Sequence, residues 1–131
     1  MLTLLISITI KQKKLKKKSY VEIWGTGKPR REFLHVKDLA DAVCFLAKNY
    51  SNECPINVGT SKDISIKELA DIISEIVGWK GSFIFNKSMP DGTMLKRLDT
   101  SKINKLGWQA KVDIKNGLKK TIKEFKSTLK N

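Results

Sequence analysis

The 131-residue chain contains few of the residues that build metal centres, disulfide frameworks and redox motifs. It has two cysteines and one histidine, too few for a zinc site with four nitrogen and sulfur ligands. Cys44 and Cys54 do not have the C-x-x-C spacing of a redox pair. No apolar run reaches the roughly 18 residues that a transmembrane helix needs. We therefore expect no metal site and no membrane span.

Acidic residues and arginines are also scarce. The chain carries 26 Lys and Arg against 13 Asp and Glu, a net charge of +13. Six lysines lie in residues 11–18 and seven in residues 111–131, whereas residues 19–110 carry a surplus of two positive charges. Only three basic residues are arginines, although phosphate and base recognition favours the bidentate guanidinium. The lysine runs indicate solvated faces. A small basic module that binds nucleic acid or an anionic surface is the alternative.

The start of the sequence differs from the rest. Residues 1–10 are apolar and precede the lysine block, the reverse of the order in a secretory signal, and no small-residue cleavage site follows. We therefore expect a cytoplasmic protein. We also expect residues 1–18 to form an apolar and lysine-rich leader that is separate from the organised region, residues 19–131.

From residue 19 onward the pattern alternates short strands with helices and predicts an α/β fold. Strands are expected at residues 20–24, 32–36, 55–59 and 82–85. Helices are expected at residues 38–49, 65–77 and 101–106 and after residue 113. Asp38 and Asp113 are the expected N-caps of two helices. Ser65 and Glu68 form a capping box, and Gly78 suits a helix end. The strands are too few and too short for a complete doubly wound sheet.

The sequence lacks the catalytic patterns of nucleotide-fold oxidoreductases. Residues 25–27 (Gly-Thr-Gly) have no third glycine and precede Pro29 and an expected strand, which predicts a β-turn and not a pyrophosphate cradle. Neither Tyr20 nor Tyr50 is followed four residues later by the lysine that lowers the pKa of a catalytic tyrosine. No pattern pairs His35 with a nucleophile. We therefore expect no catalytic or cofactor-binding residue in this chain.

Two clusters have the chemistry of a binding site. Trp24 ends an expected strand, and Arg30 and Arg31 follow the glycine turn. An aromatic ring beside a guanidinium pair suits a nucleotide base and a diphosphate. The second cluster is Pro-Asp-Gly-Thr at residues 90–93, followed by Lys-Arg at residues 96–97. We expect the two clusters to line one pocket for an anionic ligand.

The order of these motifs resembles the C-terminal part of the GDP-L-fucose synthases, which are extended short-chain dehydrogenases. The strings are WGTGKPRREFLHVKDLADA, INVGT, SIKELADIISEIVGWKG, PDGTMLKRLD and KINKLGW. The R-E-F-L-H-V-x-D-L-A run is typical of the wider superfamily, whereas PDGT-x-x-K and the WGTGKPRREF context indicate the fucose synthases. The resemblance covers residues 20–129. It implies that residues 19–131 are a substrate-binding C-terminal region of NAD-dependent epimerase/dehydratase type with an incomplete Rossmann part.

The resemblance also implies site residues and a parent reaction. By match with the family's motifs, Trp24, Arg31 and Lys96 contact the GDP-sugar, and Asp91 is expected at the same ligand. Family enzymes are homodimers that epimerise GDP-4-keto-6-deoxy-mannose and reduce its 4-keto group with NADPH. Their cofactor turn and their catalytic Ser, Tyr and Lys lie upstream of the matched region. The chain alone is therefore expected to bind GDP-sugar, but neither to bind NADP(H) nor to catalyse.

Some positions depart from the family's pattern. Residues 1–18 do not resemble the family's helix before the WG strand, and Met94 and Leu95 replace a proline and a commonly basic residue. The simplest account is a truncated or frame-shifted gene product. Apolar faces near residues 31–59 would then lack partners, which predicts a marginal fold or self-association. The positions expected to be exposed are Leu39, Val43, Leu46, Ile73 and Ile76.

Overall fold

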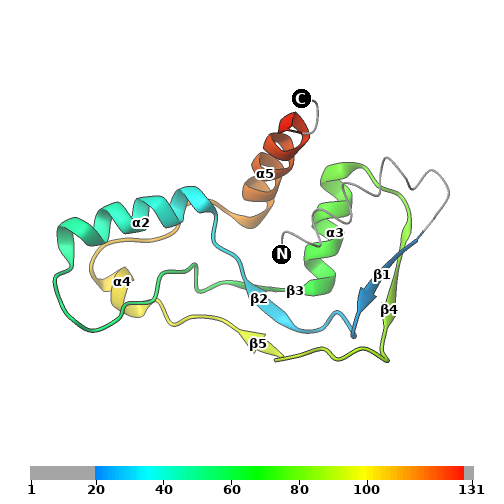
Figure 1. The fold of residues 1–131 in the computed structure, drawn as a ribbon, viewed down its shortest axis with the longest axis horizontal. Coiled ribbons are helices and arrows are strands. Elements are labelled where there is room, and N and C mark those ends of the chain that lie inside the picture. The colour runs from blue at the N-terminus through cyan, green and yellow to red at the C-terminus, as the bar shows by residue number, and fades with distance from the viewer. Residues whose placement is uncertain (1–19, 129–131) are drawn as a thin grey trace.

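The computed structural model describes residues 20–128, which form two small sheets flanked by helices (Figure 1). The expected leader, residues 1–18, lies outside the described residues. The strands are β1 (Tyr20–Trp24), β2 (Arg30–Glu32), β3 (Asp63–Ser65), β4 (Ser82–Asn86) and β5 (Leu95–Lys96). Strand β1 pairs in parallel with β4, and β2 lies between antiparallel β3 and parallel β5. The predicted α/β class with incomplete sheets is confirmed.

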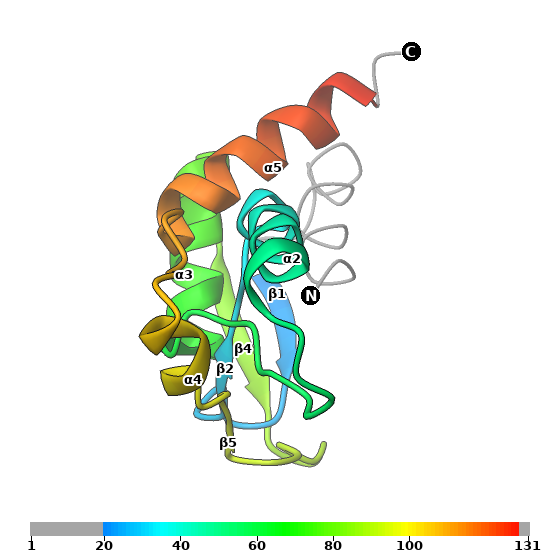
Figure 2. The same ribbon diagram turned by 90° about the vertical axis from the view of Figure 1, so that its left-hand side faces the viewer.

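Two apolar clusters join the helices to one another. The helices are α2 (Val36–Asn49), α3 (Ile66–Val77), α4 (Ser101–Lys105) and α5 (Ile114–Thr128). One cluster packs α3 against α5 through Leu69, Ile73, Leu118 and Ile122; Figure 2 shows α5 crossing above the sheets. The other joins α2 and α4 through Ala42, Ile103 and Trp108. No helix within residues 20–128 is long and apolar enough to cross a membrane.

The helix ends that the sequence marks most clearly are confirmed. The Glu68 backbone N–H donates to Ser65 Oγ at 3.1 Å, and the Ser65 N–H donates to Glu68 Oε2 at 2.8 Å. Gly78 closes α3 with φ +70°, a left-handed conformation that suits glycine. At the start of α5, Asp113 Oδ1 accepts a hydrogen bond from the Asn116 N–H at 3.0 Å. These signals are local, so a single sequence is enough to find them.

The expected N-cap of α2 is wrong. His35 takes that position, and its Nδ1 accepts from the Lys37 N–H at 3.2 Å. Asp38 lies in the first turn, is buried, and accepts from the backbone N–H groups of Lys111 and Val112 at 3.1 and 2.9 Å. Its carboxylate is therefore used to hold the segment before α5 against α2.

Two expected strands also differ from the structure. The strand expected at residues 32–36 is shorter and earlier, because β2 covers only Arg30–Glu32 and the chain turns into α2 at residue 36. Residues 55–59 form no strand. Hydrophobic content favours a strand there, but no neighbouring strand within residues 20–128 lies beside the segment to supply ladder hydrogen bonds.

The predicted exposure of apolar side chains is right for two of the three positions on α2 and wrong for α3. Leu39 and Val43 are 46% and 58% exposed, whereas Leu46 packs against the α2–α4 cluster. Ile73 is buried and Ile76 packs beside it. The reason is α5, which covers the apolar face of α3 but leaves part of α2 uncovered.

Candidate ligand-binding site

Strand β1 holds Trp24 at the surface, at the start of the glycine turn. Its side chain is 67% exposed. The next residue, Gly25, donates its N–H to the Asn86 carbonyl at 2.9 Å and has φ +79°. A Cβ at Gly25 would lie 2.2 Å from Asp91 Oδ1, so only glycine permits this close approach. The tryptophan ring is therefore available to a ligand.

Asp91 is bound to this turn. Its two carboxylate oxygens accept hydrogen bonds from the backbone N–H and the hydroxyl of Thr26, both at 2.6 Å. These hydrogen bonds, with a smaller contribution from the positive charge of Lys28, hold the pKa of Asp91 below its usual range. Asp91 is thus an anion stabilised by the turn that follows Trp24.

Arg31 and Lys96 are paired in register between the parallel strands β2 and β5. Side chains in register share one face of a sheet. Arg31 Nη1 donates to the Arg30 carbonyl at 2.7 Å, and a Cβ at Gly92 would lie 3.9 Å from Arg31 Nη2. Within residues 20–128, neither cation forms an ion pair with a carboxylate. Two positive charges therefore lie side by side, close to the loop that carries Asp91.

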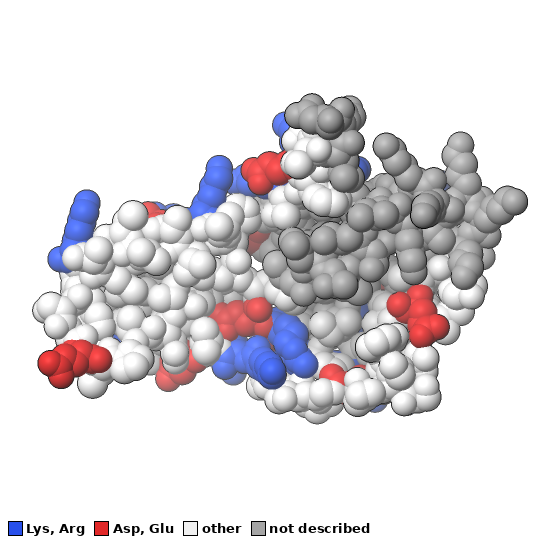
Figure 3. All heavy atoms as spheres, in the orientation of Figure 1, with Lys and Arg blue, Asp and Glu red and all other residues white. Residues whose placement is uncertain are grey.

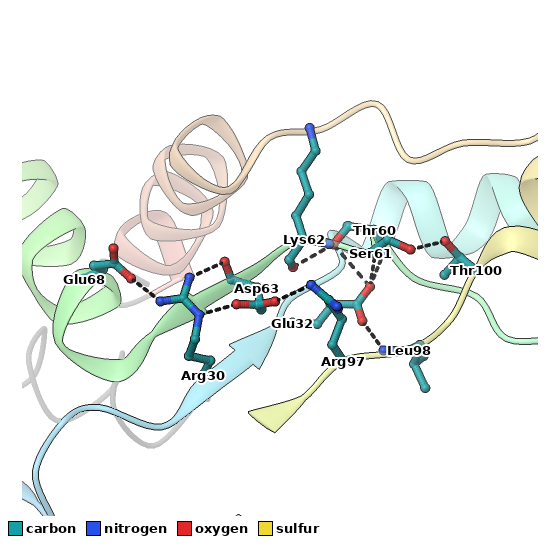
Figure 4. A network of polar contacts seen from close by, with 10 residues as sticks. All are labelled: Arg30, Glu32, Thr60, Ser61, Lys62, Asp63, Glu68, Arg97, Leu98 and Thr100. Carbon is teal, nitrogen blue, oxygen red and sulfur yellow. Dashed lines mark hydrogen bonds and ion pairs between the residues drawn. The ribbon is translucent and has the colours of Figure 1, made fainter. Parts of the chain in front are cut away.

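Arg30 does not belong to this pair of cations, contrary to the expected guanidinium pair. It pairs with Asp63 on β3 and with Glu68 on α3, the latter at 3.5 Å (Figure 4). Arg97 Nη1 also donates to Asp63, at 3.0 Å. The hydrogen bond from Arg30 is the main cause that lowers the pKa of Asp63. In Figure 3, basic and acidic atoms lie next to one another over β2, β3 and β5, as this network requires.

Glu32 is a structural residue that the sequence motif does not reveal. Its carboxylate accepts from the backbone N–H groups of Thr60, of Ser61 at 2.8 Å and of Leu98 at 2.7 Å (Figure 4). One side chain thus joins β2 to two distant segments of chain. The only signal in the sequence is an acidic residue within a short strand, which is not enough to predict this role.

The glycine turn does not have the form of a dinucleotide-binding turn. It connects β1 to β2, two strands, and not a strand to a helix. The space beside Gly25 is filled by the Asp91 carboxylate, and a Cβ at Gly27 would lie 2.3 Å from the ring of Phe85. The negative charge of this carboxylate would also repel a pyrophosphate. The turn at residues 25–27 therefore does not fit the pyrophosphate of a dinucleotide.

The four residues expected at the ligand lie on segments that contact one another but differ in their own contacts. Trp24 presents an exposed ring, and Arg31 and Lys96 are cations in register that have no ion pair within residues 20–128. Asp91 uses its carboxylate oxygens on Thr26. The geometry suits a ligand with an aromatic ring and an anionic group.

Comparison with known proteins agrees with the resemblance seen in the motifs. Residues 3–59 match the NAD dependent epimerase/dehydratase family. The chain is 50% identical over 105 residues to a probable GDP-L-fucose synthase 1 of Oryza sativa subsp. japonica, covering 80% of this chain and 32% of the rice protein. The chain spans about a third of the length of the curated relatives that it matches.

Two solved structures extend the comparison to the fold. A GDP-6-OMe-4-keto-L-xylo-heptose reductase from C. jejuni is 36% identical with a TM-score of 0.77, covering 96% of this chain and 42% of that one. A GDP-L-fucose synthetase from Naegleria fowleri bound to NADP is 25% identical with a TM-score of 0.88, covering 98% of this chain and 40% of that one. The arrangement of sheets and helices described above is thus shared with these proteins.

Proposed function

We propose that residues 19–131 bind a GDP-sugar, because residues 3–59 match the NAD dependent epimerase/dehydratase family and the chain is similar to GDP-L-fucose synthases. The observations that carry the proposal are the exposed ring of Trp24 and the register pair of Arg31 and Lys96, two cations that have no ion pair within residues 20–128. Arg30 and Arg97 are both paired with Asp63, whereas Arg31 has no carboxylate partner within residues 20–128, which leaves its guanidinium for an anionic ligand.

Each residue has a separate role in this proposal. Trp24 stacks on the guanine base, because large aromatic rings bind bases through their faces. Arg31 donates to the diphosphate, since a guanidinium presents several N–H groups to phosphate oxygens. Lys96 adds a second positive charge on the same face of the sheet. Asp91 holds the turn beside these groups.

The proposed chain binds but does not catalyse alone. In the resembled enzymes, reduction of the 4-keto group requires a proton-relay tyrosine with a lysine four residues later, and the Cys and His that epimerise C3 and C5 lie upstream of the matched region. Neither tyrosine of this sequence has that lysine. We also propose a cytoplasmic location, and a boundary at residue 18, where the lysine-rich segment ends.

An amide-correlation NMR titration of the full chain with GDP tests the proposal. We expect dispersed signals and GDP-dependent shifts that cluster at Trp24, Arg31 and Lys96. UDP at the same concentration is the control for charge alone, and Trp24→Ala should abolish most of the response. A dispersed spectrum that does not respond to GDP would refute the proposal. Binding of RNA that weakens steeply with salt, without a GDP response, would favour the alternative of a basic module.

The uncovered side of α2 supports a further part of the proposal, self-association of the chain. Val36, Leu39 and Val43 are exposed by 68%, 46% and 58%, and neighbouring exposed apolar side chains favour association. We expect the sedimentation coefficient to rise with protein concentration. Replacing Val36 and Val43 with lysine should remove this dependence without lowering Tm. A monomer that melts cooperatively at high temperature would contradict it.

A further inference from the structure

The loop between β4 and β5 is fastened to the strands beside it at both ends. At its start, the Gly25 N–H donates to the Asn86 carbonyl at 2.9 Å. At its end, the Arg30 N–H donates to the Met94 carbonyl at 2.7 Å. Between these points, Asp91 accepts both hydrogen bonds from Thr26 at 2.6 Å. The contact in the middle is the only one of the three that depends on side chains.

We propose that Asp91 is a positioning residue, which fixes the Trp24 turn relative to Arg31 and Lys96 and does not itself touch the nucleotide. This inference rests on the proposed function. It departs from the expectation that Asp91 binds the ligand. We call the contact between Asp91 and Thr26 the latch.

The chemistry of the carboxylate supports a positioning role. Each oxygen of Asp91 already accepts a short hydrogen bond from Thr26. A diphosphate is an anion, so a carboxylate that faced it directly would repel it. Directed at the turn, the same negative charge strengthens the hydrogen bonds from Thr26, because bonds to an ionised acceptor are stronger than neutral ones.

The glycines on either side of the latch show how it connects the parts of the site. Gly25, next to Trp24, has φ +79° and approaches Asp91 so closely that a Cβ would lie 2.2 Å from its Oδ1. Gly92, next to Asp91, has φ +71° and lies beside Arg31, with Nη2 3.9 Å from an ideal Cβ. The latch therefore links the residue after Trp24 to the residue beside Arg31.

Holding these groups in place reduces the entropy that binding must otherwise remove. An exposed tryptophan on a glycine turn samples several positions, and a ligand that needs one of them binds more weakly. With the latch closed, the ring and the two cations keep their spacing before the ligand arrives. Breaking it should weaken binding although every contact residue is still present.

A double-mutant cycle in the full chain tests this inference, with affinity for GDP measured by NMR titration. Thr26→Val removes the hydroxyl donor, Asp91→Ala removes the acceptor, and the third variant carries both changes. We expect Asp91→Ala to weaken binding by about tenfold, Thr26→Val by less, and the double variant no more than Asp91→Ala alone. Thr26→Ser, which keeps the hydroxyl, should restore wild-type affinity. Asp71→Asn, an exposed carboxylate on α3 paired with Lys67, is the matched control.

A second readout detects the latch without any ligand. The Thr26 amide proton donates to a carboxylate, which should place its resonance downfield. That resonance should move upfield in Asp91→Ala, and in the wild type as acid protonates Asp91. A Thr26 signal that is the same in the wild type and in Asp91→Ala would show that the contact does not exist, and would overturn the inference.

The remaining outcomes separate this inference from the proposed function. Wild-type binding that neither Thr26→Val nor Asp91→Ala changes would overturn the positioning role alone. Weaker binding by Asp91→Ala with full affinity in Thr26→Val would show that Asp91 contacts the ligand, and would also overturn it. A folded wild-type chain that does not bind GDP would overturn both the proposed function and this inference.

Discussion

The two faces of the β3–β2–β5 sheet use neighbouring arginines in opposite ways. On one face, which we call the ion-pair face, Arg30 and Arg97 pair with Asp63, and Glu32 accepts hydrogen bonds from adjoining backbone. On the other, Arg31 and Lys96 have no ion pair within the described chain. Adjacent residues of a strand point to opposite sides, so one dipeptide supplies both a structural cation and a free one.

This difference shows that the composition of a motif does not assign its roles. The sequence Arg30–Arg31–Glu32 contains three charged residues in a row, and only the middle one is left for a ligand. The outer two are engaged by partners from β3, from the turn after Gly59 and from Leu98. Each side of the sheet can therefore be tested with its own measurement, stability for one and affinity for the other.

The largest effect should come from Glu32→Ala. Three backbone N–H groups, of Thr60, Ser61 and Leu98, lose their acceptor, and leaving such groups unsatisfied costs about 1–3 kcal/mol each where they are shielded from water. We expect a loss of about 3 kcal/mol in total, with Tm falling by about 10 °C or more. Thermal unfolding followed by circular dichroism measures this. Glu53→Ala, at an exposed position, is the control, and an equal effect there would contradict the role of Glu32.

The next effect should come from Arg31→Ala. Charge-assisted hydrogen bonds to a ligand contribute about 1.5–3 kcal/mol, so we expect affinity for GDP to fall by about 10-fold to 100-fold. Tm should change little, because Arg31 donates only to the neighbouring carbonyl of Arg30. Isothermal titration measures the affinity for GDP, and a melting curve on the same sample measures Tm. A large loss of Tm with unchanged affinity would show that Arg31 stabilises the fold and does not bind the ligand.

Arg30→Ala should lower the stability of the chain and leave its affinity for GDP unchanged, and its effect should be smaller than that of Arg31→Ala. Asp63 would keep Arg97 as its one remaining partner, and the pairs of Arg30 are partly exposed, so we expect Tm to fall by a few degrees. Affinity for GDP should be unchanged. High salt should reduce the difference from the wild type, since exposed ion pairs are screened. A loss of affinity at full stability would place Arg30 at the ligand.

The smallest effect should be a decrease of Tm at acidic pH. The hydrogen bond from Arg30, and then the charges of Arg30 and Arg97, hold the pKa of Asp63 below its usual value. A lowered pKa contributes stability above the pKa of the unfolded chain, and this contribution is lost as the pH falls through the lower folded value. We expect Tm to be steady down to about pH 4 and to decrease below it. In Asp63→Asn, which lacks this contribution, Tm should start lower and decrease less steeply.

The parts of the fold that follow from the sequence are those with local causes. The capping box of Ser65 and Glu68 and the left-handed Gly78 depend on neighbours within a few positions. The strands expected at residues 20–24 and 82–85 form because they pair with each other. The strand expected at residues 55–59 is wrong because a strand needs a partner, and hydrophobic content does not supply one. The N-cap of α2 is His35 and not Asp38 because the carboxylate binds backbone that lies 73 and 74 positions later.

In the candidate site too, some features follow from the sequence and others depend on distant contacts. Motif matching names Trp24, Arg31, Asp91 and Lys96, and their contact with a ligand stays a prediction. Three features involve residues 28 to 66 positions apart: the ion pair of Arg30 with Asp63, the acceptor role of Glu32, and the bond between Thr26 and Asp91. No local pattern encodes such pairs.

The bond between Thr26 and Asp91 also has a consequence for the order in which the chain folds. It joins residues 65 positions apart, and the enclosed segment contains β2, α2, β3, α3 and β4. Contacts of such high sequence separation form late, because closing a long loop costs entropy before any contact repays it. During synthesis, Trp24 leaves the ribosome early but is held in place only after the loop before β5 has followed. A protease cut in the exposed stretch at residues 51–55 would place Trp24 and Lys96 on separate pieces. Binding would then become a bimolecular property of two peptides.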